Sequence, residues 1–246
     1  MITSFFRSIL PHSLPAILFC FPMLLKGQRA FVDDFTLSGD TYLTEDFCFR
    51  LTEAVDYRSG SIWYKYPIKL SEPFGIELSI MAGCDDRGGA DGMVFVFSPW
   101  ANLDGYVGEG MGFAGLNPAI GLELDTWQNY HLNDPEEDHL ALLVNGRVGH
   151  FSELSRPWLI PNIEDCTRHR LVVSWLPDEQ RLQVEIDDQE VFSALLDLSQ
   201  TVFKGYDQVY WGVTAATGRY HNIHEVCFDR MSMGKDWEDR PLDRTD

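Results

Sequence analysis

Basic residues are scarce in this sequence. Its 246 residues include 19 lysines and arginines against 38 aspartates and glutamates, which gives a formal net charge of −19. An acidic surface repels phosphate backbones and anionic lipid headgroups. The composition therefore argues against nucleic acid and against anionic membranes as partners, and it favours cations and neutral ligands.

The N-terminal region lacks an apolar run long enough to cross a bilayer. The run Leu14–Leu25 has 12 residues and is broken twice by proline, whereas a membrane-spanning helix needs about 20 residues. Its place after Arg7 and before Ala30, a candidate cleavage residue, is typical of an export signal. We therefore expect residues 1–30 to be a signal peptide and the mature protein to be secreted, periplasmic or extracellular, without membrane insertion. The alternative is a buried N-terminal segment of a cytoplasmic protein.

The sequence has no Cys-x-x-Cys pair, which excludes the usual zinc-binding signature. Removal of Cys20 with the signal peptide would leave Cys48, Cys84, Cys166 and Cys227. An even number of cysteines in an exported protein is compatible with two disulfides, and four cysteines allow three pairings. The sequence leaves open both the pairing and the choice between disulfides and buried thiols.

Linkers, internal repeats and low-complexity segments are also missing. Apolar residues make up 45% of the chain and aromatic residues 13%, which is enough for a two-layer core. We expect one domain over residues 31–234, followed by a polar C-terminal tail over residues 235–246.

Helical periodicity is nearly absent, and the chain is instead built from short alternating or apolar segments separated by turn residues. Val191–Phe203 is the only helical candidate, and it could equally be a short strand and a turn. Repeated short strands favour an all-β sandwich or barrel. The predicted strands are Phe47–Leu51, Ser61–Ile68, Phe74–Met81, Met93–Phe97, Ile120–Asp125, Leu140–Val144, the hairpin pair Arg170–Leu176 and Arg181–Ile186, Val209–Val213 and Glu225–Met231.

The segment Gly121–His139 carries a concentration of metal-ligand chemistry. On a strand, Glu123 and Asp125 project from one face, because side chains two apart share a face. Two adjacent carboxylates repel each other unless a cation lies between them. The following loop adds oxygen ligands and one imidazole. Oxygen ligands suit calcium, and a carboxylate set with one imidazole suits manganese or a similar transition metal. A solvated acidic loop is the alternative for the bare Glu-x-Asp pair.

The spacing of this loop resembles that of the legume-type (L-type) lectins. That family has Glu-x-Asp-x-aromatic-x-Asn, then Asp-Pro, then His five residues after the second Asp, and the same pattern stands here. The resemblance implies a concanavalin A-like jelly-roll sandwich of antiparallel sheets. It also implies that the transition metal is bound by Glu123, Asp125, Asp134 and His139, and calcium by Asp125, the Trp127 carbonyl, Asn129 and Asp134. Glu136, Glu137 and Asp138 are interpreted as solvated, and His131 as a rim residue.

Two glycine-rich motifs extend the resemblance. Gly88–Gly92 contains Ala-Asp-Gly, in which the family's Asp follows a cis peptide bond and accepts sugar hydroxyls, so Asp91 is the candidate here. Gly105–Phe113 resembles the loop whose backbone N–H reaches the same sugar oxygen. Gly110 is the preferred donor, with Glu109 or Gly108 as alternatives if the register differs by one. No Lys and no helix follow this loop, so a phosphate-binding loop is excluded.

The third motif, Trp211–Gly218 with Arg219–His224, resembles the family's penultimate strand and specificity loop. Gly218, Arg219, Tyr220, His221 and Asn222 are its candidate sugar contacts, although structural turn residues would look the same. The cysteines are unusual for plant members, which together with the export signal predicts a microbial or otherwise non-plant lectin, and a bacterial one first.

The resemblance predicts a non-enzymatic lectin that binds glycans or glycoconjugates with Ca²⁺ and Mn²⁺, or a similar transition metal, as cofactors. Asp91, Asn129 and a glycine-loop amide would bind hydroxyls while Trp127 packs on the sugar ring. Because a single sugar site of this kind binds weakly, several linked sites are needed for useful avidity, and a homo-oligomer is the expected form. One alternative is a laminarinase-like glycoside hydrolase, but its third carboxylate would have to stand at Trp127 or Gln128. A structural adhesion domain is the other.

Overall fold

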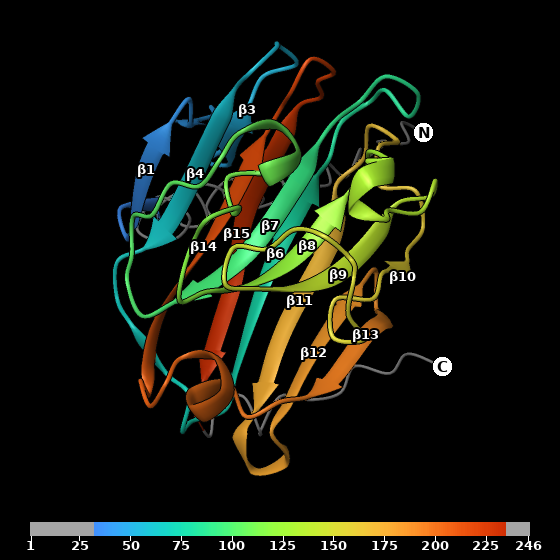
Figure 1. Ribbon diagram of the computed structural model, residues 1–246. Helices are drawn as coiled ribbons and strands as arrows, with labels where there is room; N and C mark the ends of the chain where they lie inside the picture. Colours follow the sequence, from blue (N-terminus) through green and yellow to red (C-terminus); the bar gives the residue numbers. More distant parts are fainter. Residues whose placement is uncertain (1–31, 235–246) are drawn as a thin grey trace, which may run out of the picture.

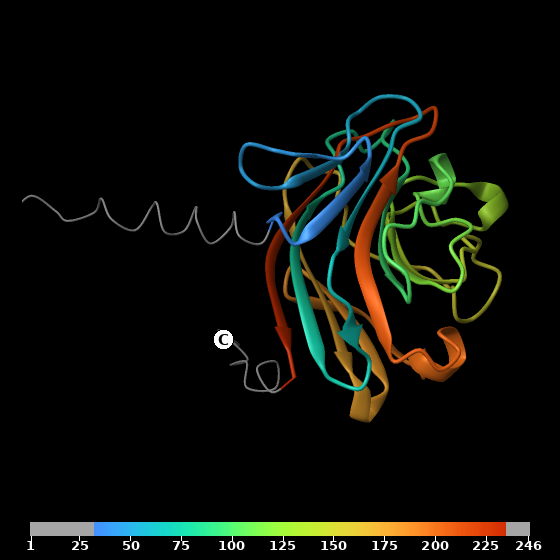
Figure 2. The same ribbon diagram turned by 90° about the vertical axis from the view of Figure 1, so that its left-hand side faces the viewer.

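The computed structural model describes residues 32–234, which form two antiparallel β-sheets packed face to face (Figures 1 and 2). The predicted signal peptide and the tail lie outside the described residues. The strands are β1 Phe35–Gly39, β2 Tyr42–Leu43, β3 Phe49–Thr52, β4 Ser59–Tyr64, β5 Ile68–Lys69, β6 Phe74–Met81, β7 Gly92–Ser98, β8 Ile120–Asp125, β9 His139–Val144, β10 Trp158–Leu159, β11 His169–Leu176, β12 Arg181–Ile186, β13 Gln189–Leu195, β14 Gln208–Ala216 and β15 His224–Met233.

One sheet has eight strands in the order β1-β4-β14-β7-β8-β9-β10, with β5 pairing beside β14, and the other has seven in the order β13-β12-β11-β6-β15-β3-β2. Short helical turns lie in the connections: η1 Gly108–Gly110, η2 Tyr130–Leu132, η3 Pro177–Glu179 and the π-helical η4 Leu198–Val202. The predicted all-β sandwich of antiparallel sheets is confirmed. Within residues 32–234 no helix is long and apolar enough to span a membrane.

The central strands of the eight-stranded sheet are buried on both faces. On β7, Phe95 and its alternate neighbours enter the core between the sheets, whereas Val94 and Val96 enter a second apolar cluster on the outer face. Met111 and Phe113 of the following loop complete that second cluster. The loops drawn in green therefore cover the outer face of this sheet in Figure 2. This packing holds the glycine-rich loop against the sheet.

Most predicted strands are present, with differences at the edges. The segment predicted as one strand, Ser61–Ile68, is divided into β4 and β5 around Pro67, whose ring removes a backbone donor. The candidate Val191–Phe203 resolves into the end of β13 and the short η4 rather than a regular α-helix. The short edge strands β1, β2 and β10 were not predicted.

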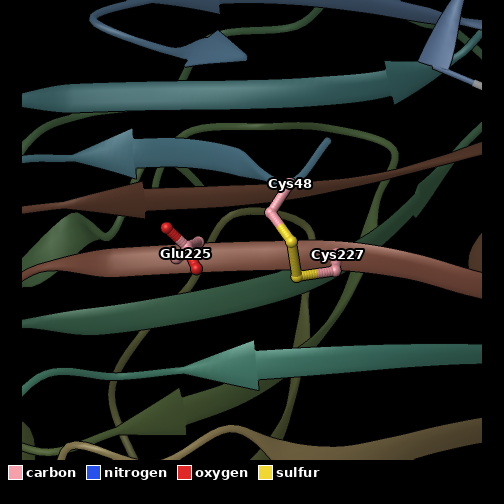
Figure 3. Close-up of side chains that lie close together, drawn as sticks. All are labelled: Cys48, Glu225 and Cys227. Carbon is pink, nitrogen blue, oxygen red and sulfur yellow. A yellow bond between two sulfur atoms is a disulfide. The ribbon is translucent and has the colours of Figure 1, made fainter. Parts of the chain in front are cut away.

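The four cysteines within residues 32–234 form two disulfides, Cys48–Cys227 and Cys84–Cys166. Figure 3 shows the first of them, which joins the segment entering β3 to β15 beside Glu225. Glu225 is bound by Arg50 at 2.8 Å and by Arg168 at 2.6 Å. Because both sulfur atoms are in the disulfide, neither is a thiolate, and this cluster is structural rather than a metal site.

Candidate functional site

The register between β8 and β9 brings the first metal-ligand candidates together. Asp125 lies opposite His139, and Glu123 lies opposite Ala141. Leu122 and Leu124 face the core, so the two acids point to the opposite face, as the alternation predicts.

Both carboxylates are buried, and Glu123 also lacks the hydrogen-bond partners that burial normally requires. Glu123 is 1% exposed and neither of its side-chain oxygens has a hydrogen-bond partner. Burial first, and then the charge of Asp134, raises the pKa of Glu123 well above its usual value. Burial and the neighbouring Glu123 do the same to the pKa of Asp125. Buried, unpartnered acids of this kind are expected where a cation supplies the missing charge.

The loop after β8 folds back so that more oxygen atoms face the same region. The backbone N–H of Trp127 donates to Asp125 Oδ1 at 2.7 Å, and the N–H of Asn129 donates to Asp134 Oδ2 at 2.8 Å. The remaining Asp134 Oδ1 and the Asn129 Oδ1 are buried without partners. This oxygen-rich set fits a calcium ion.

His139 is held in the form that ligates metals. It is 1% exposed, and its Nδ1 lies 3.3 Å from the carbonyl oxygen of Glu137. Burial lowers its pKa to about 4, with a smaller contribution from His150. At neutral pH the ring is therefore uncharged and its Nε2 carries a lone pair.

A second imidazole, from His150, enters this cluster and was not predicted. Its Nε2 lies 3.2 Å from Glu123 Oε2, 3.3 Å from Asp134 Oδ1 and 3.2 Å from His139 Nε2. His150 is outside the spacing on which the metal loop was identified, and it reaches the cluster from the long connection between β9 and β10. No local pattern marks it.

The interpretation of Asp138 as a solvated acid is wrong. Its side chain is buried, and its Oδ2 accepts the Ile163 N–H at 2.8 Å. It therefore anchors the connection after β10. Glu136 and Glu137 are exposed, as predicted. His131 is also exposed and lies 3.1 Å from Glu109, a rim position.

Asp91 lies beside the end of β14, at the start of β7. The Ala90–Asp91 bond is cis, and the Asp91 N–H donates to the Ala216 carbonyl at 3.2 Å. Asp91 is 4% exposed, and its Oδ2 has no hydrogen-bond partner. Burial first, and then the charge of Glu109, raises the pKa of Asp91 to about 7.

The glycines place backbone close to this carboxylate. A Cβ added to Gly218 would lie 3.3 Å from Asp91 Oδ2, and one added to Gly108 would lie 3.7 Å from the Cα of Gly218. The Gly110 N–H instead faces the Val107 carbonyl at 3.4 Å within its own turn. Gly110, and Gly108 or Glu109 as the alternatives, remain the predicted donors of this turn.

Trp127 and Tyr220 form the apolar part of the site. Their rings are stacked with centroids 4.3 Å apart, and Tyr220 is 51% exposed. Arg219 is exposed beside them. His221 lies 2.9 Å from Asp56. The specificity loop therefore contacts the metal loop directly.

Asn222 is a brace rather than a candidate sugar contact. It is 3% exposed, its Oδ1 accepts the Cys84 N–H at 3.0 Å, and its Nδ2 donates to Glu164 at 2.7 Å. Its backbone N–H donates to the Ala90 carbonyl at 3.0 Å, next to Asp91. Burial raises the pKa of Glu164 to about 8. Sequence reasoning missed this brace because its members are far apart in the chain.

The family model of the legume lectin β-barrel domain matches residues 27–230. This range includes every candidate residue of the site. The chain belongs to the L-type lectin family. The family consists of non-enzymatic carbohydrate-binding proteins, so the chain is a carbohydrate-binding lectin rather than a laminarinase-like hydrolase.

Solved plant lectins share the fold of this lectin at low sequence identity. Lectin I-B4 of Griffonia simplicifolia, in its metal-free form, is 21% identical, with a TM-score of 0.68 over 82% of this chain and 94% of that chain. The Bauhinia forficata lectin in complex with GalNAc is also 21% identical, with a TM-score of 0.67 over 82% and 93% of the two chains. Lectin II from Ulex europaeus is 19% identical, with a TM-score of 0.67 over 82% and 93%.

Proposed function

We propose that this lectin binds a neutral glycan at Asp91, in a site whose shape depends on calcium and a transition metal. The observation that carries the proposal is a convergence of buried polar atoms without partners. Asp91 Oδ2, Asn129 Oδ1 and both Glu123 oxygens lack hydrogen bonds. Such atoms are costly to bury unless a ligand or an ion satisfies them.

The sugar would be bound by a small set of polar groups beside an apolar platform. Asp91 would accept hydrogen bonds from two adjacent hydroxyls, and a backbone N–H of the Gly108–Gly110 turn would add a third bond. The Asn129 amide would donate to the same hydroxyls. The exposed Tyr220 and its stacking partner Trp127 would pack against the C–H groups of the ring. A neutral ligand suits the acidic chain.

The metal loop would hold both ions through residues already placed together. Calcium would be bound by Asp125, the Trp127 carbonyl, Asn129 and Asp134. The transition metal would be bound by Glu123, Asp125, Asp134 and His139. Bound ions would supply the positive charge that keeps these carboxylates ionised and adjacent. The loop is then ordered before the sugar arrives, which lowers the entropy cost of binding.

Export and oligomerisation are part of the same proposal. The two disulfides support an oxidising compartment, in line with a secreted or periplasmic protein. A single shallow sugar site binds at about 1 mM, or about −4 kcal/mol. Several linked sites would raise the avidity, so we propose that the functional form is a homo-oligomer.

The decisive variant is Asp91→Asn, tested on a glycan array that includes galactose and GalNAc structures. We expect all array binding to fall at least tenfold, because the amide replaces one acceptor with a donor. Asp207→Asn is the matched control, since Asp207 contacts Ser71 at 3.1 Å and adjoins Gln208, at the far end of β14 from Ala216. Unchanged binding by Asp91→Asn would place the sugar elsewhere, and a wild type that binds no glycan would favour a structural adhesion domain.

A further inference from the structure

His150 is a buried imidazole that the proposed function leaves without a role. Its side chain is fully buried, and it comes from the connection between β9 and β10 rather than from the metal loop. Together with Glu123 and His139 it forms a group whose ligand atoms all lie within 4.8 Å of one another. The other ring nitrogen of His150 contacts a backbone carbonyl, so only its Nε2 faces this group.

The orientation of His150 directs a lone pair into the cluster. Its Nδ1 lies 2.7 Å from the Ser155 carbonyl, which can only accept a hydrogen bond, so Nδ1 carries the proton. His139 is arranged in the same way, with its Nδ1 near the Glu137 carbonyl at 3.3 Å. Each ring therefore has its Nδ1 at a backbone carbonyl and directs its Nε2, the nitrogen free to ligate a metal, to the same point. A hydrogen bond from the far nitrogen to a carbonyl is the usual support of a metal-ligating histidine.

The distances around His150 fit a shared ion better than a network of hydrogen bonds. Its Nε2 is 3.2 Å from Glu123 Oε2 and 3.3 Å from Asp134 Oδ1, yet neither carboxylate oxygen accepts a hydrogen bond. Two ligand atoms that are each about 2.0–2.2 Å from one metal lie about 3–3.5 Å apart. A cation among these atoms would also separate two facing lone pairs, those of His139 and His150.

We propose that His150 is a protein ligand of the transition-metal site, which makes that site a two-imidazole centre that selects zinc-like ions over manganese. Imidazole nitrogen favours Zn²⁺, Ni²⁺ and Cu²⁺, whereas carboxylate and water favour Mn²⁺. A second imidazole therefore strengthens zinc binding more than manganese binding. The inference rests on the metal centre of the proposed function but not on its sugar binding.

The test is a metal titration of the apoprotein in the presence of Ca²⁺ and without any glycan. Zn²⁺ affinity is measured by competition with a chelator, and Mn²⁺ affinity by the loss of the free-ion electron paramagnetic resonance signal. We expect His150→Ala to weaken Zn²⁺ binding by roughly 10- to 100-fold or more and Mn²⁺ binding by about threefold or less. His169→Gln is the control, because His169 pairs with Asp187 at 2.7 Å in the other sheet.

X-ray absorption of the wild type with one equivalent of Zn²⁺ gives a second readout that needs no variant. Two imidazoles in the zinc shell are expected, and one imidazole would overturn the proposal even if His150→Ala fails to fold. An unchanged Zn²⁺ to Mn²⁺ affinity ratio in a folded His150→Ala protein would also overturn it. A wild type that binds neither ion would remove the metal centre itself, whereas loss of sugar binding with two imidazoles intact would refute only the sugar site.

Discussion

At the residue scale, the site is a set of acids whose burial opposes their ionisation. Burial raises the pKa of Asp91 to about 7 and that of Glu164 to about 8. Burial and the charge of Asp134 raise the pKa of Glu123 well above its usual value, and burial and the charge of Glu123 do the same to the pKa of Asp125. Without metal, the folded protein therefore keeps protons that the unfolded chain releases at lower pH.

This imbalance predicts that the metal-free protein loses stability between about pH 6.5 and 8.5. The unfolded acids are already ionised in that window, whereas in the folded state Asp91 and Glu164 release their protons only as the pH passes about 7 and about 8. The free energy of unfolding therefore falls as pH rises until these protons are lost. Each carboxyl that stays protonated contributes about 1.4 kcal/mol per pH unit. His139 and His224, whose pKa values burial lowers to about 4 and about 3, act in the opposite direction only below about pH 6.5.

Urea unfolding at pH 6.5, 7.5 and 8.5 measures this effect in the apoprotein and in the metal-loaded protein. The metal-loaded protein should show a flatter profile, because bound cations keep the carboxylates ionised in the folded state. An apoprotein whose stability stays constant or rises across the window would contradict the raised pKa values of these buried acids.

The sequence predicted the residues whose spacing is local and missed those that the fold brings in from afar. Glu123 and Asp125 are two apart on a strand, so alternation alone places them together. His150 and Glu164 lie in long connections, where no periodicity fixes the direction of a side chain. Asp138 was misassigned because an acidic run is usually solvated, whereas here the Ile163 backbone N–H satisfies one member.

At the scale of elements, one disulfide supports the site directly. Cys84–Cys166 holds the segment before β7, where the Cys166 N–H donates to the Gly83 carbonyl at 2.9 Å. Asn222 connects this segment to Ala90, the neighbour of Asp91. Cys48–Cys227 instead joins the segment entering β3 to β15 in the other sheet. Both bridges therefore stabilise the fold, but only Cys84–Cys166 lies beside the proposed sugar site.

Replacing each cystine by a pair of serines should lower stability by similar amounts. The bridges span 82 and 179 residues, and loop entropy changes slowly with length, so about 2–5 kcal/mol is expected for either. Only Cys84→Ser/Cys166→Ser should also weaken sugar affinity, by roughly tenfold or about 1.4 kcal/mol. Urea unfolding and sugar titration measure the two effects. Equal sugar affinity in both double variants would show that the Asn222 brace does not depend on its disulfide.

Strand prediction was reliable where burial is strong and poor where strands are short. β6 matches its predicted range because apolar residues fill it, whereas β2 and β10 have two residues each and exist only through pairing. The division between β4 and β5 follows from a proline inside an otherwise strand-like run. Extended pairing depends on tertiary neighbours that a local pattern does not reveal.

At the scale of the whole molecule, the sandwich supports the loops that carry the proposed sugar and metal sites. Two apolar clusters, one between the sheets and one under the glycine-rich loop, fix β7, β8 and β14. The sugar-binding and metal-binding candidates all stand on or beside these strands. The all-β fold and the family were predictable because three motifs are spread along the chain, whereas the pairing of the cysteines was not.

In the proposed function, two ions bound by the metal loop both stabilise that loop and shape the sugar site. The most direct test of this proposal is to follow sugar affinity and melting temperature together after exhaustive EDTA treatment and after return of Ca²⁺ with Zn²⁺ or Mn²⁺. We expect EDTA to abolish sugar binding. We also expect it to lower the melting temperature by roughly 5–10 °C relative to protein in a free metal concentration of about 100 times the Kd of the metal. Return of the ions should restore both. Metal-free protein that keeps its sugar affinity would contradict the account.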